Sequence, residues 1–274
     1  MSIFKELDLI SNKLRRNIII TSAKSRIPHL GSCLSCLDIM VYLYWEELNL
    51  NSQRPDDLNR DRFVLSKGHG APALFHVLAE KGFFEKKLLN EIGKSGSYFH
   101  EHPPKPGLIP GIEAATGSLG HGLPMALGMA LAEQINSLNF FTYSLISDGE
   151  CNEGSIWEAA MLAASNNVNK LTVIIDYNKW QATGRSNEIM ALEPLNKKWE
   201  SFGWDVIEIN GHDFNAMKKA FNSCKSSKNK PSVIIAHTIK GKGVSFMEDN
   251  NNWHYRIPND EELKSALADL ECNL

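Results

Sequence analysis

The chain has 274 residues, which is enough for one α/β domain with a large core. Hydrophobic residues make up 43% and charged residues 22%, as in soluble globular proteins, and the net charge of −3 gives no field that would attract nucleic acid. No apolar run approaches the ~20 residues that span a bilayer, and the charged N-terminus lacks a signal-peptide core. We therefore expect a cytoplasmic protein with no nucleic-acid or membrane partner.

The cysteines give no sign of a disulfide framework. There are five, an odd number without framework spacing, which fits reduced thiols in a cytosol. Cys33 and Cys36 form a CxxC pair, but no second pair accompanies them. We interpret them as small core residues rather than as a zinc or redox site.

The first elements in chain order are helices. Apolar residues at steps of three or four predict an amphipathic helix over 4–24 and a second helix over 35–48. Together they form an N-terminal helical segment, about 1–50. The next segment, 62–66, is typical of a short buried strand, and it ends in the turn "KGHGAP", which opens another helix.

Strands and helices alternate through the rest of the chain. The patterns predict a glycine-rich turn and helix at 118–134, strands at 140–147, 171–176, 203–210 and 231–238, and helices at 153–167 and 213–225. The strand at 171–176 is apolar on both faces, as in a covered parallel sheet. We therefore expect one doubly wound α/β domain over 1–274, with a mainly parallel sheet, helices on both faces and a C-terminal tail at about 250–274.

Polar side chains gather where the predicted strands end. The stretch "LISDGECNEG" (145–154) places Asp148 after one strand, and Asn178 follows the next strand in the sheet. Ligands bind at the carboxyl ends of the strands in such sheets, and carboxylate, amide and carbonyl oxygens suit Mg²⁺ or Ca²⁺. Gly149 would let the backbone approach a bound anion closely. Taken singly, Asp148 and Asn178 could equally be a helix cap and a turn residue.

Several motifs, taken in order, resemble the transketolase family. They are "DGECNEG…WEAA…L…IIDYN", "DRFVLSKGHGAPALFHVLAEKGFF" (61–84), "ATGSLGHGLPMALGMALA" (115–132) and "HTIKGKGVSFMEDNNNWH" (237–254). The resemblance covers nearly the whole chain and implies the diphosphate-binding domain of the thiamine-diphosphate-binding fold, with thiamine diphosphate and Mg²⁺, or Ca²⁺, as cofactors.

The resemblance also assigns metal and cofactor residues. It implies that Asp148 and Asn178 bind the metal through side chains and Trp180 through its carbonyl oxygen. The implied cofactor contacts, including the loop at the aminopyrimidine end, are Ser32, His69, Gly117, Ser118, Leu119, Gly149, Asn178, Lys240 and His254.

Catalytic roles follow from the same resemblance. His29 matches a histidine that meets the substrate carbonyl, and an imidazole near neutral pH can donate to an oxyanion or move a proton. His102 matches a histidine that contacts sugar hydroxyls, with His100 close enough to leave the register open, and His254 is the substrate-side histidine. Glu153 matches a buried acid in a network toward a second active site across a dimer.

Other histidines and several departures from the family pattern have simpler interpretations. We interpret His76, His212 and His237 as hydrogen-bonded structural residues. Ser147 stands where glycine usually precedes the metal aspartate, "PHLG" stands where "GHPG" is common around His29, and His121 stands where glutamine is common. Relative to the family pattern, about two residues are inserted between His102 and the "PG" at 110–111. These departures leave the sugar specificity open.

The family uses a glutamate on a second, pyrimidine-binding domain, and no segment here matches that domain. We therefore expect the N-terminal subunit of a split transketolase, completed by a C-terminal transketolase-like chain that supplies the glutamate, in an α₂β₂ assembly or around a homodimer core. It would transfer a two-carbon ketol unit from a ketose or ketose-phosphate donor to an aldehyde. The alternatives are decarboxylating acyl transfer from a 2-oxo acid and a non-catalytic cofactor-binding partner.

Overall fold

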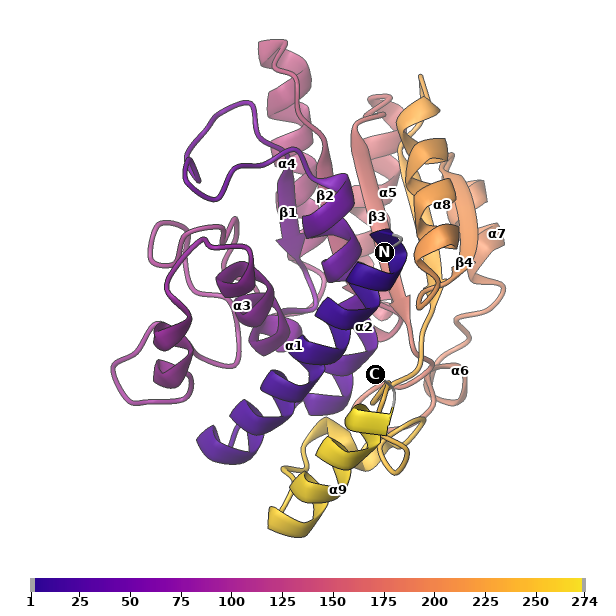
Figure 1. Ribbon diagram of the computed structural model, residues 1–274. Helices are drawn as coiled ribbons and strands as arrows, with labels where there is room; N and C mark the ends of the chain where they lie inside the picture. The colour runs from indigo at the N-terminus through magenta and orange to yellow at the C-terminus, as the bar shows by residue number, and fades with distance from the viewer. Residues whose placement is uncertain (1–2, 273–274) are drawn as a thin grey trace.

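The strands form one parallel sheet (Figure 1). The structure is a computed structural model, and it describes residues 3–272. Within those residues the strands are β1 Arg62–Leu65, β2 Thr142–Ser147, β3 Leu171–Tyr177, β4 Asp205–Asn210 and β5 Ser232–His237. Their order is β1-β2-β3-β5-β4, and every neighbouring pair is parallel. All five carboxyl ends therefore lie along one edge of the sheet.

Helices cover both faces of this sheet (Figure 1). They are α1 Ile3–Ser25, α2 Leu30–Tyr42, α3 Ala71–Glu80, α4 Gly122–Asn136, α5 Gly154–Ser165, α6 Ser186–Ile189, α7 Leu195–Ser201, α8 Phe214–Ser226 and α9 Asp260–Cys272. Helices α1, α2, α3 and α8 share one apolar core, and α4, α5 and α7 share the other. Within the described residues, no helix is long and apolar enough to cross a membrane.

The central strands feed both cores because successive side chains of a strand point to opposite faces. On β3, Ile174 packs in the core of α1 and α2, whereas Val173 and Ile175 pack in the core of α4 and α5. The whole of β3 is buried. The predicted doubly wound α/β fold is confirmed.

Helix α2 begins five residues before the predicted start at 35. It runs from Leu30 to Tyr42 and continues as a π-helical turn, Leu43–Glu47. Every residue of α2 is buried. The alternation of buried and exposed positions that marks an amphipathic helix is therefore missing, and the periodicity could not locate the first turn.

The predicted C-terminal tail contains a helix, α9, that the sequence patterns did not reveal. Ala266 and Leu270 of α9 are buried in the core of α1, and Arg16 donates to Glu271 over 2.8 Å. The tail therefore returns to the N-terminal helix (Figure 1). Residues 1–2 and 273–274, the ends of the two predicted terminal segments, lie outside the described residues.

Candidate active site

A cavity of about 420 Å³ opens at the carboxyl edge of the sheet. Most of the predicted site residues line it: His29, Ser32, His69, His102, Gly117, Leu119, Gly149, Glu153, Asn178, Trp180 and His254. Asp148 and Lys240 lie buried beside it, whereas Ser118 is exposed between two lining residues. The cavity therefore gathers residues that the sequence spreads over more than two hundred positions.

Asp148 sits at the tip of β2, fully buried. Its Oδ1 accepts from the Gly149 amide at 2.9 Å and its Oδ2 from the Ser186 hydroxyl at 2.7 Å. Burial raises the pKa of Asp148 to about 7, with nearby Asp176 adding to the rise. No ion pair to Asp148 is found among residues 3–272. A buried carboxylate without a paired cation suits a bound metal ion.

Asn178 is held in one orientation by the end of β3. Its Nδ2 donates to Ser35 Oγ and to Asp176 Oδ2, at 3.3 Å each, so its oxygen points the other way. There Asn178 Oδ1 accepts the Trp180 amide at 3.0 Å across a turn in which Lys179 has a φ of 69°. Carboxylate, amide oxygen and carbonyl oxygen together form a donor set for a hard cation.

A buried ion pair that sequence reasoning missed supports this arrangement. Lys67 follows β1 and donates to Asp176 Oδ2 and to the Ser32 carbonyl, and the side chains of Lys67 and Asp176 are fully buried. Asp176 also accepts from Ser35 at 2.6 Å and from Thr238. The available signal was a lysine two residues after the apolar end of β1 and an aspartate near the end of the apolar run of β3.

Four neighbouring histidine rings form one wall of the cavity. The ring centroid of His29 lies 5.5 Å from that of His69, 6.1 Å from that of His102 and 5.1 Å from that of His254. His100 is exposed and lies outside the cavity lining, whereas His102 lines the cavity. His29 has a left-handed backbone, with a φ of 69°, directly before α2, and its amide donates to the His254 carbonyl at 2.8 Å.

Three of these imidazoles are neutral near pH 7. Burial, aided by His102 and Lys240, lowers the pKa of His29 to about 4. Burial and Lys240 lower the pKa of His254 to about 3, and burial with Lys67 holds the pKa of His69 well below its usual value. His29 Nδ1 and Gln181 Nε2 are buried with no hydrogen-bond partner in the described part of the chain. Both residues line the cavity, so a bound ligand would satisfy atoms that the fold leaves unpaired.

Lys240 approaches the histidines from the loop after β5. Its ammonium donates to Asn251 Oδ1 at 2.8 Å and to His254 Nδ1 at 3.1 Å, which leaves the ring proton of His254 on Nε2. Burial and the charge of Lys67 lower the pKa of Lys240 to about 8. The ammonium is therefore a buried cation next to the cavity.

The role predicted for Glu153 depends on a second chain and stays a prediction, whereas the nearby glutamate that is buried within this chain is Glu150. Glu153 lines the cavity mouth but is exposed in this chain, whereas Glu150 is fully buried. Residues 149–152 form a 3₁₀ turn that directs Glu150 inward, where it accepts from Ser66, from the Gly120 amide and from the Ser147 amide. Glu150 is the residue that ties the 117–121 loop to the end of β2.

Close packing explains two other local features. A Cβ on Gly149 would lie 2.9 Å from Cγ of Gln181, so a side chain there would push into the cavity wall. Ser147, which replaces the usual glycine, keeps the turn closed because its hydroxyl accepts the Glu150 amide at 3.2 Å. Its presence is therefore compatible with the position of Asp148.

Residues with predicted structural roles have structural partners. His76 bonds to Thr21, His212 to Asp38 and His237 to Glu208. Cys33 and Cys36 are buried free thiols, and burial raises their pKa values to about 11 and about 12. Among residues 3–272, no three His, Cys, Asp or Glu side chains gather as a metal site. The set around Asp148 has one carboxylate and is of a different kind.

Comparison with known proteins decides the family. The family model described as "Transketolase, thiamine diphosphate binding domain" matches residues 10–272. The chain belongs to the transketolase family. This confirms the resemblance that the motifs carry.

Relatives of similar length are named as transketolase subunits. The chain is 39% identical over 264 residues to an apulose-4-phosphate transketolase subunit of Phocaeicola vulgatus, covering 96% of this chain and 93% of that protein. It is 41% identical over 261 residues to "6-deoxy-6-sulfo-D-fructose transketolase subunit SqwG" of Clostridium sp., covering 95% and 94%. The predicted correspondence to the N-terminal subunit of a split transketolase is confirmed.

Longer transketolases contain a region that is similar to this chain. The solved transketolase of Leishmania mexicana superposes with a TM-score of 0.90 at 29% identity, covering 97% of this chain and 41% of that one. Human transketolase is 37% identical over 246 residues, which are 89% of this chain and 38% of that protein. The chain thus spans about two fifths of these longer enzymes.

Proposed function

We propose that this chain is the thiamine-diphosphate-binding subunit of a two-chain transketolase, which transfers a two-carbon ketol unit from a ketose or ketose phosphate to an aldehyde. One observation carries the proposal: Asp148, a fully buried carboxyl group without an ion-pair partner among residues 3–272, adjoins Gly149 in the lining of the cavity that also holds four histidine rings. The subunit names of relatives with nearly the same length support it. No relative named above favours 2-oxo acid decarboxylation.

The oxygen atoms at the ends of β2 and β3 suit the binding of a divalent metal ion together with a diphosphate. Asp148, Asn178 and the Trp180 carbonyl would hold Mg²⁺, or Ca²⁺, with the diphosphate completing the shell. Diphosphate contacts would come from Ser32, His69, Gly149, Lys240 and His254. Backbone groups of 117–119 would hold the aminopyrimidine end. When bound, thiamine diphosphate supplies an electron sink for the two-carbon fragment.

The histidines would act on the sugar. Because His29 is neutral near pH 7, it can donate one ring hydrogen to a substrate carbonyl oxygen as negative charge develops there. His102 lies beside it and would hold a sugar hydroxyl.

A second chain would complete this site. We infer that a C-terminal transketolase-like subunit supplies the catalytic glutamate and that the assembly is α₂β₂, with the cytoplasm as its location. Exposed Glu153 at the cavity mouth would then be covered by a neighbouring chain. The relatives act, by their names, on apulose 4-phosphate and 6-deoxy-6-sulfo-D-fructose, which makes modified ketoses the first donors to test.

Gentle purification from the native cells tests this proposal. Native mass, chain composition and bound thiamine diphosphate are measured, followed by ketol transfer with ketose phosphates and short aldehydes. We expect a second chain, bound cofactor and transfer that stops in Asp148→Asn. The matched control, Asp205→Asn, should keep activity because Asp205 pairs with Ser227 and Lys230 at the opposite end of the sheet. A lone chain that binds no cofactor with added Mg²⁺ would refute the proposal.

A further inference from the structure

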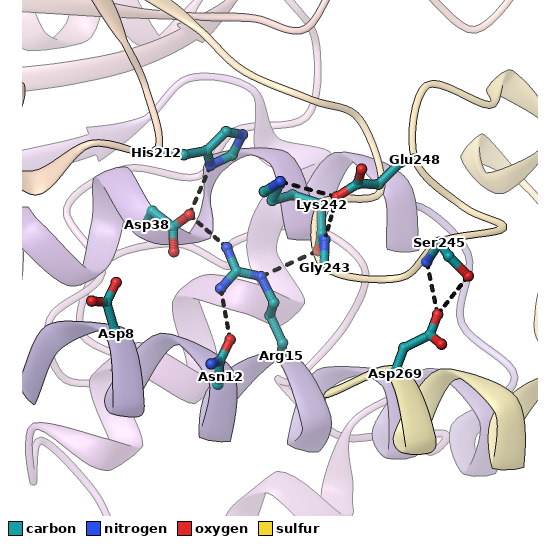
Figure 2. A pocket seen from close by; sticks show the side chains of 10 residues that line it. All are labelled: Asp8, Asn12, Arg15, Asp38, His212, Lys242, Gly243, Ser245, Glu248 and Asp269. Atoms are coloured by element: carbon teal, nitrogen blue, oxygen red, sulfur yellow. Dashed lines mark hydrogen bonds and ion pairs between the residues drawn. The ribbon is translucent and has the colours of Figure 1, made fainter. Parts of the chain in front are cut away.

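Another cavity, of about 580 Å³, lies between α1, α2, α9 and the loop after β5 (Figure 2). It shares no lining residue with the candidate active site. Three of its residues form a buried network: Arg15 of α1, Asp38 of α2 and His212, which follows β4. The loop that they face, 238–249, carries Lys240 toward the active site, and we call it the Lys240 loop.

His212 holds the loop immediately before Lys240. The Ile239 amide donates to His212 Nε2 at 2.9 Å, so that nitrogen must be unprotonated. The ring proton is therefore on Nδ1, which donates to Asp38 Oδ2 at 2.7 Å. His212 thus links the backbone next to Lys240 to a buried carboxylate on α2.

Arg15 holds the loop immediately after Lys240. Its Nη2 donates to Asp38 Oδ2 at 2.5 Å, and its Nε donates to the Lys242 carbonyl at 3.2 Å (Figure 2). The loop also packs closely here, because a Cβ on Gly243 would lie 2.9 Å from Arg15 Cδ. Gly243 has a φ of 93°, a backbone that glycine adopts without strain.

Helix α2 connects this network to the active site. It begins after His29, carries Ser32 in its first turn and Asp38 two turns later. The Gly241 amide donates to the Gly31 carbonyl at 2.9 Å, and a Cβ on Gly31 would lie 3.1 Å from Lys240 Cγ. The position of Lys240 relative to His29 therefore depends on how the loop is fixed to α2.

Stability alone explains this network poorly. A buried ion pair often contributes little net stability relative to apolar residues of the same volume. Asp38 Oδ1 is, in addition, buried with no hydrogen-bond partner among residues 3–272, which costs free energy. What the network does achieve is to bind the backbone on both sides of Lys240 to rigid helices.

We propose that Arg15, Asp38 and His212 are positioning residues that hold the Lys240 loop so that the Lys240 ammonium reaches the active-site cavity. The inference rests on the proposed function in one respect, namely that Lys240 binds the diphosphate. Its mechanical part, that the network fixes the loop, stands independently of any cofactor.

The first test measures amide hydrogen exchange in the full-length chain. In His212→Leu, peptides covering 238–249 should exchange about tenfold faster or more, because the partly buried hydrogen bond of the Ile239 amide is lost. His212→Gln, whose amide can both accept and donate, should restore most of the protection. The control is His237→Leu, since that exposed side chain pairs with Glu208 outside the loop. Unchanged exchange in His212→Leu overturns the proposal; if that variant does not fold, His212→Phe carries the same expectation, because its ring cannot accept from the Ile239 amide.

The second test measures thiamine diphosphate affinity of the chain with its co-purified partner in Mg²⁺. His212→Leu should weaken affinity by about tenfold, and it should add little in a Lys240→Gln background because both changes act through one ammonium. If His212→Leu acted through a general structural defect, its loss of affinity would add in full to that of Lys240→Gln. That result overturns the proposal. If the wild-type complex binds no thiamine diphosphate, the proposed function fails, and the exchange measurement alone decides whether the network fixes the loop.

Discussion

Breaking the Lys67–Asp176 ion pair should destabilise the protein strongly. Both side chains are fully buried. In Lys67→Met, Asp176 keeps its bonds from Ser35 and Thr238 but loses its cation, and in Asp176→Asn the Lys67 ammonium is left buried without a counter-charge. Removing one partner of a buried pair costs about 3–5 kcal/mol. At about 2 °C per kcal/mol for a domain of this size, Tm should fall by about 6–10 °C.

The pH dependence of this effect follows from the two pKa shifts. Burial raises the pKa of Asp176, but Lys67 and the hydrogen bonds from Ser35 and Thr238 together lower it below 3.8. The contribution of Asp176 is therefore present above pH 3.8 and is lost as pH falls through the lower folded value. Burial lowers the pKa of Lys67, but Asp176, with smaller effects of Cys36 and Cys33, raises it above 10.5 overall. The contribution of Lys67 is therefore present below pH 10.5 and is lost as pH rises through the higher folded value. The contribution of the intact pair should therefore be constant between about pH 5 and 9.

Urea unfolding of the chain, followed by circular dichroism, measures the cost. The double variant Lys67→Met/Asp176→Asn should cost less than the sum of the single variants, because neither charge is then left alone. The exposed pair Lys197–Glu200 provides the control, and Lys197→Met should cost less than about 1 kcal/mol. If the free energy of unfolding of Lys67→Met lay within about 1 kcal/mol of the wild-type value, the reasoning from buried charge would be refuted.

Four further outcomes are expected. Asp148→Asn should weaken Mg²⁺-dependent thiamine diphosphate binding, measured by calorimetry, by more than the roughly 10–100-fold typical of residues that only support a metal ligand. In the wild type, Mg²⁺ affinity should fall about tenfold per pH unit below about pH 7, since proton and metal compete for the Asp148 carboxylate. His29→Ala should lower kcat in transfer assays more than it weakens cofactor binding. Glu150→Ala should lower the free energy of unfolding in urea by about 1–3 kcal/mol, because it leaves the buried Gly120 amide unpaired.

Each expectation has an outcome that contradicts it. Normal cofactor affinity in Asp148→Asn would contradict the assignment of Asp148 as a metal ligand. A Mg²⁺ affinity that is independent of pH between about 5 and 8 would likewise show that Asp148 binds no metal. Loss of cofactor affinity alone in His29→Ala would mean that His29 contacts cofactor rather than substrate. For Glu150, the matched control is Glu153→Ala, whose free energy of unfolding should equal that of wild type because Glu153 is exposed. Equal losses of this free energy in both variants would contradict the structural role given to Glu150.

Local patterns located most of the site because a parallel sheet brings its strand ends together. Asp148 and Asn178 each follow an apolar strand, so the predicted topology alone put both side chains at one edge. Motif resemblance then added His29, His69, His102 and Lys240 from separate loops. The structure brings these residues together around one cavity or beside it.

Three features could not be predicted from the sequence patterns, for physical reasons. Helix α2 is buried on every side, so it has no amphipathic pattern to mark its start. Glu150 and Glu153 lie in one turn, and only the 3₁₀ geometry decides which one is buried. Helix α9 was missed within a segment interpreted as a tail, although it packs on α1.

The sequence by itself determined the alternation of strands and helices, the parallel sheet and the polar residues at its strand ends, because these depend on residues close together in the chain. The pairing of Lys67 with Asp176 and of His212 with Ile239 could be recognised only in the folded chain. Those pairs join distant segments, and their burial and relative orientation arise only when the helices close over both faces of the sheet.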